Sequence, residues 1–258
     1  MKKTIYLTVL GMLATAATFT SCLKDSCDDA PYVICPINQP NALVTVKPNE
    51  DNTAFRMQLT DDVALWPVNM RKSPFGAKEV RAFVNLRQPT EKELGEGGII
   101  ADIPNVYVNW IDSIVTKPAV ENLLGDEENR QKYGTDPIEI VDDWMTVAED
   151  GYLTLRVRTR ISGHKKHIVN LVHRSDVNTP YYFTLYHNAQ GDTYGEVGDA
   201  VVAFKLPDMG PMTGEREQML TLEWQSYTGT KTVRFRFRAN NTNTTNEELP
   251  SMSNQCFE

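Results

Sequence analysis

Apolar and polar side chains alternate along several segments of this chain, and this two-residue period constrains the fold more than any other feature. The alternation is clearest at residues 55–59, 80–86, 153–161, 220–225 and 233–238. Successive side chains of a β-strand point to opposite faces, so each segment is expected to be a strand with one buried face. Parallel sheets are usually apolar on both faces. We therefore expect an all-β protein built from antiparallel sheets.

Turn-forming residues separate these segments, at 48–52, 95–98, 150–151, 191–192 and 228–229. Glycine, asparagine and aspartate favour turns there because they tolerate unusual backbone angles or bond to their own backbone. One short helix is expected at Asp126–Tyr133, where three acidic residues suit the positive N-terminal end and Gly134 follows as a terminator. We interpret this helix as a connector outside the core.

The spacing of the strands divides the chain near Lys117-Pro118. Strands before this point are interrupted by a glycine-rich, charged stretch, whereas those after it recur regularly, which favours a sandwich. The polar run at 240–248 has no apolar side chains to bury. We therefore expect a small β-barrel at 41–117, an antiparallel β-sandwich at 118–239 and a flexible tail at 240–258.

The N-terminal residues 1–21 have the order of a bacterial lipoprotein signal peptide. Two lysines precede an apolar run at 5–19, which is short for a membrane-spanning helix. A small residue and Cys22 then resemble a lipobox, although Phe19 stands where the commonest lipobox has leucine. We expect cleavage before Cys22, lipidation of this cysteine, and a tether at 22–40. The other interpretation is an ordinary signal peptide followed by an incidental cysteine.

An acidic stretch at 25–29 follows Cys22. It resembles the export signals that send some lipoproteins of Gram-negative bacteria to the cell surface. A solvated tether would have the same composition and would leave the protein on the periplasmic side. We expect a lipid-anchored protein of the outer membrane, with surface display as the preferred interpretation.

Three cysteines remain if Cys22 carries lipid, namely Cys27, Cys35 and Cys256. An odd number permits one disulfide with one thiol left over, and the envelope is a compartment in which disulfides persist. A Cys35–Cys256 bridge would hold the C-terminal tail. The sequence does not show whether their Cα atoms come within reach of each other.

Two rows of arginine lie on strand-like segments and are the candidate ligand-binding residues: Arg156, Arg158, Arg160, Arg234, Arg236 and Arg238. If the two strands were neighbours, six guanidinium groups would share one sheet face. Such a patch could bind anions, because the guanidinium fork matches carboxylate and phosphate. The alternative is that acidic residues interleave with the arginines and leave a solvated face with little net field.

The histidines and acidic clusters give weaker signals. His167 and His173 share a strand face but lie about 20 Å apart, too far for one metal ion. Asp142, Asp143 and the adjacent tryptophan could serve sugar chemistry, but neighbouring side chains diverge on an extended chain. Asp136 suits a turn in which it accepts backbone N–H bonds. We expect no metal site, no catalytic residue and no cofactor.

The balance of charge argues against one class of partner. The chain has 26 basic and 34 acidic residues, a net charge of −8. Nucleic-acid binding needs a basic surface, so no nucleic-acid partner is expected. The sequence also contains no G-x-S-x-G, H-E-x-x-H or P-loop motif.

A series of short motifs, in order along the chain, resembles the NigD-like lipoproteins. The motifs are Phe55–Asp62, Leu65–Pro67, Lys78–Val84, Tyr133–Ile138, Trp144, Gly151–Leu153, His167–Val172 and His187–Asp192. The resemblance implies an N-terminal OB-type β-barrel and a C-terminal β-sandwich on a lipid anchor. It also implies an association with a bacteriocin locus, and it supplies no catalytic residue. The three cysteines after Cys22 are not part of the family pattern.

These expectations favour a non-catalytic lipoprotein of the envelope or cell surface that acts as a binding module. A glycan, a peptide toxin or another envelope protein would be its ligand, and the lipid would bind it to the membrane. The alternative is an envelope hydrolase that acts on glycans through carboxylates that are not adjacent in sequence.

Overall fold

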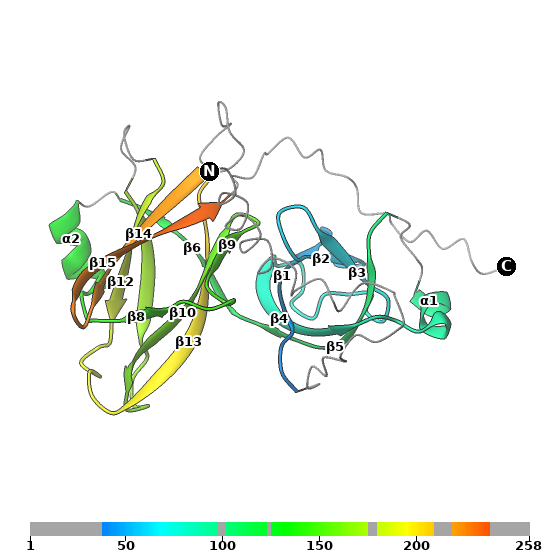
Figure 1. The fold of residues 1–258 in the computed structure, drawn as a ribbon, viewed down its shortest axis with the longest axis horizontal. Helices are drawn as coiled ribbons and strands as arrows, with labels where there is room; N and C mark the ends of the chain where they lie inside the picture. The colour runs from blue at the N-terminus through cyan, green and yellow to red at the C-terminus, as the bar shows by residue number, and fades with distance from the viewer. Residues whose placement is uncertain (1–37, 98–101, 123–124, 175–179, 209–217, 238–258) are drawn as a thin grey trace, which may run out of the picture.

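A computed structural model describes residues 38–97, 102–122, 125–174, 180–208 and 218–237. Within them the chain forms two β-domains that lie side by side (Figure 1). The predicted barrel and sandwich are confirmed. The expected signal peptide, the four cysteines, Arg238 and the C-terminal tail lie outside the described residues.

The first domain is a closed barrel of five strands. The strands are β1 (Ala42–Pro48), β2 (Phe55–Gln58), β3 (Ala64–Pro67), β4 (Val80–Arg87) and β5 (Asn105–Ser113). They follow the order β1-β2-β3-β5-β4, and β4 closes the barrel by pairing with β1. The alternating apolar residues, such as Val44, Met57 and Val84, are fully buried inside it. Closure leaves the barrel without the free edges of an open sheet.

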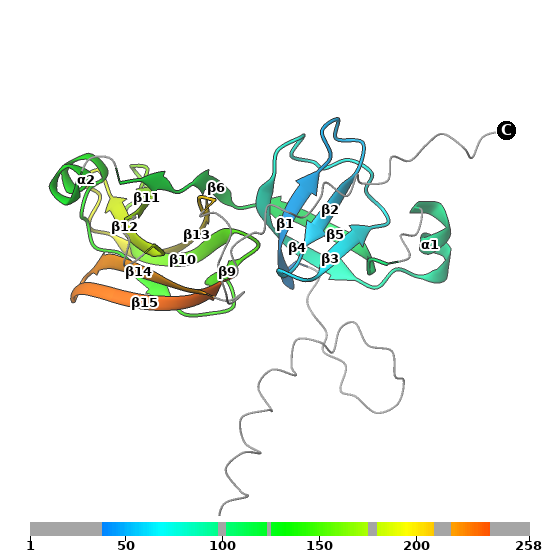
Figure 2. The ribbon, with the colours of Figure 1, turned by 90° about the horizontal axis from the view of Figure 1, so that it is seen from above.

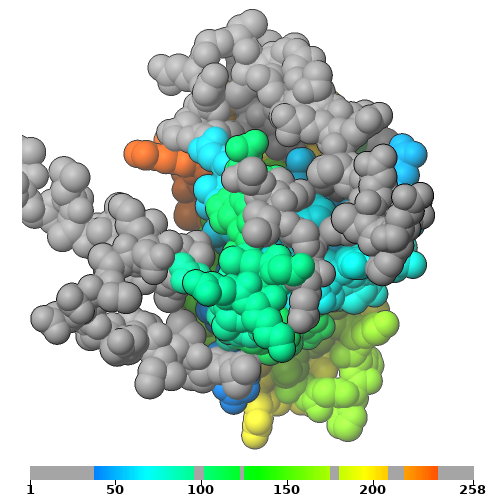
Figure 3. All heavy atoms as spheres, turned by 90° about the vertical axis from the view of Figure 1, so that its right-hand side faces the viewer, coloured from blue at the N-terminus to red at the C-terminus, as the bar shows by residue number. Residues whose placement is uncertain are grey.

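A helix occupies part of the glycine-rich stretch that we expected to be a turn, so the turn prediction at Gly95 is wrong. Helix α1 spans Glu91–Gly97. Thr90 and Glu93 form a reciprocal cap: the Thr90 amide donates to the Glu93 carboxylate at 2.8 Å, and the Glu93 amide donates to the Thr90 hydroxyl at 3.4 Å. This capping box satisfies free amides at the start of the helix, which forms although Gly95 and Gly97 lie within it. Seen from the barrel end, α1 stands at the front, away from the sandwich (Figure 3).

The second domain consists of two packed sheets, seen as two layers in Figure 2. The first sheet has the order β6-β13-β10-β8, with β9 also paired to β10. Its strands are β6 (Val115–Pro118), β8 (Glu139–Val141), β9 (Val147–Glu149), β10 (Tyr152–Ile161) and β13 (Glu196–Lys205). The second sheet has the order β15-β14-β12-β11-β7. Its strands are β7 (Val120–Glu121), β11 (Ile168–His173), β12 (Tyr182–Asn188), β14 (Gln218–Ser226) and β15 (Gly229–Phe237).

The core of the sandwich lies between the inner faces of these sheets. It includes Leu155 from the first sheet and Phe183 and Leu222 from the second. Most neighbouring strands are antiparallel, as predicted, but β6 and β7 pair in parallel with β13 and β11, respectively, and the long strands β12 and β14 also pair in parallel. The chain between them crosses to the first sheet to form β13, so both strands enter the second sheet in the same direction. This parallel pairing determines which side chains meet on the outer face of that sheet.

Helix α2 spans Asp126–Tyr133, as the sequence predicted. Gly134 ends it with a φ of 83°, a conformation that glycine adopts without the penalty of a Cβ atom. The helix packs against β12. It therefore covers part of the outer face of the second sheet.

The two domains share a buried contact. The chain leaves the barrel at Ile114, because β6 from Val115 already pairs with β13 of the sandwich. This transition lies a few residues before the expected division at Lys117-Pro118. Leu43 and Ile114 pack against Tyr152 of the sandwich in a small apolar cluster. Polar groups surround this cluster, so the contact combines burial with hydrogen bonds.

Candidate functional site

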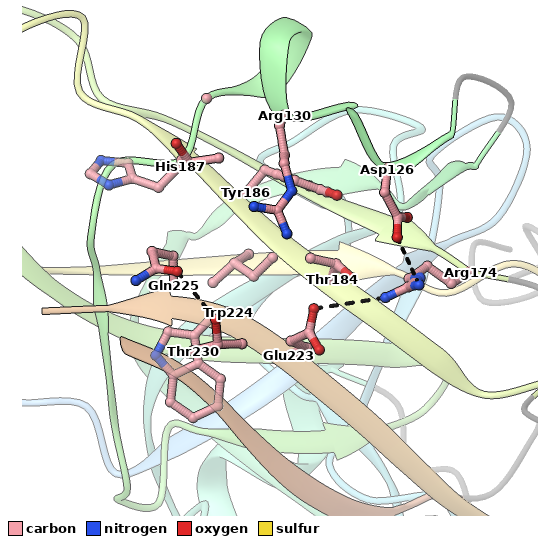
Figure 4. Close-up of a pocket in the computed structure, with 13 residues that line it drawn as sticks. Asp126, Arg130, Arg174, Thr184, Tyr186, His187, Glu223, Trp224, Gln225 and Thr230 are labelled. Carbon is pink, nitrogen blue, oxygen red and sulfur yellow. Dashed lines mark hydrogen bonds and ion pairs between the residues drawn. The ribbon is translucent and has the colours of Figure 1, made fainter. Parts of the chain in front are cut away.

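A hollow on the outer face of the second sheet is the candidate site. It measures about 440 Å³ with its open mouth included. Strands β12 and β14 form its floor, with Thr184, Tyr186, Glu223 and Gln225, and helix α2 stands over it (Figure 4). Ligand sites in proteins are usually such concave surfaces with a few polar groups in place. The hollow therefore has the concave shape and the polar lining of a candidate ligand site.

Two contacts hold α2 over the hollow. The Asn129 side chain is buried and donates to the Asn122 side chain at 2.5 Å. The Tyr133 ring packs on the Tyr186 ring with centroids 6.0 Å apart. Because these contacts lie on the side of the helix that faces the sheet, residues beside them project over the hollow. The helix that we interpreted as a connector thus forms one wall of the candidate site.

Arg174, just after β11, is the paired cation of the hollow. Its guanidinium lies 2.9 Å from Asp126 of α2 and 3.8 Å from Glu223 of β14. Glu223 also accepts a hydrogen bond from the Tyr182 hydroxyl at 2.7 Å. Burial and then this bond raise the pKa of Tyr182 to about 12, so the hydroxyl keeps its proton at neutral pH. The two carboxylates of the hollow are therefore engaged.

Arg130 and Thr184 retain unused hydrogen-bonding capacity. The Arg130 side chain extends from α2 toward the floor (Figure 4), and within the described ranges it makes no ion pair or hydrogen bond. Thr184 is only 7% exposed, and its hydroxyl has no hydrogen-bond partner there. A buried polar group without a partner costs roughly 1–3 kcal/mol. A ligand with acceptor atoms would satisfy both groups.

The structure places the two predicted rows of arginine on different sheets, so they do not form a single patch. Arg156 and Arg158 lie on β10 of the first sheet, and both bind Asp199 of β13. Arg156 also binds Asp143 at 2.5 Å. The hydrogen bond from Arg158, and then that from Arg156, hold the pKa of Asp199 well below its usual range. Acidic residues therefore interleave with this row.

Arg160 on β10 and the arginines on β15 are the remaining described members of the predicted patch. The Arg160 guanidinium donates to the carbonyl oxygen of Gly195 at 3.2 Å. Arg234 and Arg236 lie on β15 and are exposed, with no acidic partner among the residues that the structure describes. They are opposite Thr221 and Met219 of β14, on the same face as Glu223. The second row therefore borders the hollow.

His167 and His187 contact each other. Their rings stack with centroids 5.1 Å apart, and Nδ1 of His167 lies 2.9 Å from Nε2 of His187. On the other side of His187, Nδ1 lies 3.2 Å from the Asp136 carbonyl oxygen. Burial, and then the charge of His167, lower the pKa of His187. Across the described chain, no group of three metal-ligating side chains is assembled.

We predict that His187 makes the fold less stable in acid. Its folded-state pKa lies below the unfolded value near 6.5, so the unfolded chain takes up a proton that the folded chain resists. The free energy of unfolding should then be highest above pH 6.5 and fall as the pH drops through the folded-state pKa. Each unit of difference between these two pKa values corresponds to about 1.4 kcal/mol.

Urea unfolding at pH 7.5 and 5.5 tests this pH dependence. His187→Gln should flatten it, because glutamine remains neutral, whereas the exposed His164→Gln should leave it as in the wild type. An unchanged pH dependence in His187→Gln would contradict this assignment.

The acidic residues considered for sugar chemistry have structural contacts. Asp143 accepts the Met145 amide at 2.9 Å as well as its bond from Arg156. Asp136 accepts the Ala189 amide at 2.7 Å, as expected of a carboxylate that orders a loop. Burial raises the pKa of Glu149, which lies near Arg81 at the contact between the two domains. These carboxylates do not line the hollow.

Sequence reasoning missed the main residues of the hollow. Arg130 lies on the predicted helix, but nothing in the helix sequence shows which strand lies beneath it. Thr184 lies on β12, which was not among the segments predicted as strands. The alternation in β14 placed Glu223 on a polar face, which is the one local signal for this site.

Comparisons with known proteins agree with this architecture. The NigD-like N-terminal OB domain matches residues 43–114, and the NigD-like C-terminal beta sandwich domain matches residues 121–237. The chain belongs to the NigD-like family. No match was found among curated proteins. None of the described helices of this NigD-like chain is long and apolar enough to cross a membrane.

Solved structures of similar proteins cover both domains. A Parabacteroides distasonis protein described as toxin related is 29% identical, with a TM-score of 0.61, over 77% of this chain and 93% of its own. A Bacteroides vulgatus protein of unknown function is 20% identical, with a TM-score of 0.54, over 83% and 95%. A NigD-like immunity protein of Bacteroides caccae is 18% identical, with a TM-score of 0.54, over 77% and 97%. At these identities, the last two structures show only that this chain shares their fold.

Proposed function

We propose that this NigD-like chain is a non-catalytic lipoprotein of the bacterial envelope that binds a peptide toxin and thereby protects the cell. The observation that carries the proposal is the open hollow, in which Arg130 and the Thr184 hydroxyl have no partner within the described structure. Such unused donors suit the capture of a ligand. A toxin-related protein among the similar structures supports a toxin as the ligand.

The proposed position in the cell depends on the N-terminal residues. Lipid on Cys22 would anchor the two domains at the outer membrane, at the cell surface or on its periplasmic side. A toxin that enters from outside would meet the protein in either position. A glycan or another envelope protein as ligand would be recognised by binding without any change in toxin sensitivity.

The hydrolase alternative receives no comparable support. Asp126 and Glu223 are the carboxylates of the hollow, and both form ion pairs with Arg174. A general acid for glycoside cleavage needs a carboxyl that stays protonated near neutral pH. Both carboxylates are engaged by the Arg174 guanidinium, and Glu223 also accepts the Tyr182 hydroxyl, so neither is left free to donate a proton to a glycosidic oxygen.

A protection assay tests the proposed function. A bacteriocin-sensitive Gram-negative host that expresses the full-length chain should tolerate a several-fold higher bacteriocin concentration than the same host with an empty vector. Cys22→Ala should release the protein from membranes and remove the protection, because the lipid anchor is lost. Membrane fractionation and growth inhibition are the two measurements. Equal sensitivity of the wild-type and empty-vector cells, with the protein anchored, would contradict the proposal.

A further inference from the structure

Two free cations on β15 of the second sheet form a row that continues from the hollow, and a third lies over the hollow on α2. Arg174 is neutralised by Asp126 and Glu223, whereas Arg130, Arg234 and Arg236 have no acidic partner within the described ranges. The whole chain is acidic, with a net charge of −8. These arginines therefore make a local positive surface on an acidic protein. Such a surface favours a negatively charged ligand.

The strand register places Arg234 and Arg236 on one line with the β14 residues of the hollow, and Arg130 lies over the hollow on α2. On the outer face, Gln225 is opposite Thr230, Glu223 is opposite Thr232, Thr221 is opposite Arg234, and Met219 is opposite Arg236. The Glu223 carboxylate therefore lies between the hollow and the two arginines, where Arg174 and the Tyr182 hydroxyl engage it. From Gln225 to Met219 is roughly 20 Å at about 3.4 Å per residue. An extended segment of about six residues covers this length. The hollow lies at the Gln225 end of the line, and the two β15 arginines lie toward the other end.

The spacing within β15 has the period of an extended peptide. Arg234 and Arg236 are two positions apart on one strand, so their Cα atoms are about 6.8 Å apart. Alternate side chains of an extended peptide have the same repeat. Acidic residues at alternate positions of such a peptide would each meet one guanidinium. A carboxylate and a guanidinium form a two-bonded, charge-assisted contact, which gives direction as well as attraction.

The hollow supplies a different kind of contact at its end of the line. A carboxylate beneath α2 would accept hydrogen bonds from Arg130 and from the Thr184 hydroxyl, which is buried without a partner in the described structure. The Trp224 ring is part of the core, and the Tyr186 ring on the floor is only 6% exposed and packs against Tyr133, so neither offers an open flat face on which a sugar ring could stack. The geometry therefore favours a peptide over a glycan.

We propose that this face binds an acidic peptide segment in an extended conformation. One carboxylate lies in the hollow on Arg130 and Thr184, and carboxylates at alternate positions lie on Arg234 and Arg236. This inference rests on the proposed function, since it specifies the part of the toxin that is recognised. It retains two arginines of the predicted patch and replaces Arg156 and Arg158, which are neutralised, with Arg130.

The test measures peptide binding by the full-length lipoprotein in detergent. The probe is a fluorescein-labelled peptide of alternating glutamate and threonine, long enough to cover the line, and the reference is its glutamine counterpart. The glutamate peptide should bind in a salt-sensitive manner and the glutamine peptide should not. Arg130→Glu, and Arg234→Glu with Arg236→Glu, should each weaken binding about tenfold or more.

Two further variants separate binding from folding. Arg71→Glu with Lys72→Glu makes the same double change of charge on the exposed surface of the barrel and should bind as the wild type does. Thr184→Val keeps the shape of the side chain and removes the unpartnered hydroxyl, so it should bind more weakly while unfolding at the same or a higher temperature.

Three results would overturn the inference. The first is that the glutamate peptide does not bind. The second is that the Arg130→Glu and double β15 variants bind it as well as the barrel control does. The third is that an oligogalacturonate binds in place of the peptide. The protection assay distinguishes this inference from the proposed function. If protection survives Arg130→Glu and the double β15 variant, only the inferred peptide site is overturned. If cells that express the wild-type chain are not protected, the proposed function is overturned.

Discussion

Arg81→Met is expected to lower the free energy of unfolding by about 3–5 kcal/mol at pH 7.5, because one partner of a buried charge network is removed. Arg81 has no exposed surface, although it is an arginine on a barrel strand. Its guanidinium donates to Thr45 of the barrel at 3.0 Å and to Thr154 of the sandwich at 3.3 Å. It therefore joins the two domains from inside their contact.

The acidic groups around Arg81 determine how this loss depends on pH. Burial raises the pKa of Glu149, and the charge of Arg81 opposes that rise. Without Arg81 the folded-state pKa of Glu149 should lie further above the unfolded value. A raised carboxyl pKa leaves stability intact below the unfolded pKa and removes it as the pH rises through the folded-state pKa. The deficit of Arg81→Met should thus be largest at pH 7.5 and shrink toward pH 4.5.

Urea unfolding of the wild type and the variant at these two pH values is the measurement. Arg71→Met replaces an exposed arginine of the same domain and should change stability little. Arg81→Lys keeps the charge but loses the planar fork, so an intermediate loss is expected. A variant as stable as the wild type at pH 7.5 would show that the domain contact does not depend on this charge.

Some strands could be predicted from the sequence because burial in them follows the two-residue period, whereas β12 is buried at five successive positions and carries no such signal. Leu220, Leu222 and Trp224 of β14 are buried while the residues between them are more exposed. Helix α2 was also predictable, since its acidic first turn and its terminal glycine are local signals. Helix α1 carried a local signal too, in Thr90 and Glu93, but the glycines nearby pointed to a turn.

The candidate site could not be predicted in the same way because it depends on which strands become neighbours. Thr184 meets Glu223 through the parallel pairing of β12 and β14, and that pairing requires the chain to cross through the other sheet. Likewise, Arg156 is neutralised by Asp199, 43 positions away. No short segment contains both members of either pair. The periodicity gives the face on which a side chain lies, and the topology gives its partner.

Gly134→Ala is expected to displace α2 and impair the hollow. Gly134 has a φ of 83°, which costs other residues about 1–3 kcal/mol. A Cβ atom here would also lie 2.7 Å from the carbonyl oxygen of His187 and 2.8 Å from the Cβ atom of Asn188. Both atoms belong to β12, so the floor of the hollow cannot give way, and the end of the helix must move instead.

Gly163→Ala separates these two costs, because Gly163 has a similar φ of 81° in the same domain, yet a Cβ atom added there would meet no described atom within 4 Å. Both variants should lower the free energy of unfolding because alanine is strained at a positive φ. Gly134→Ala should lower it further because its Cβ atom also meets β12. Only Gly134→Ala should also weaken binding of the glutamate peptide, since Arg130 moves with the helix. Equal stability and equal binding in the two variants would show that the close approach of Gly134 to β12 is not what holds α2 over the site.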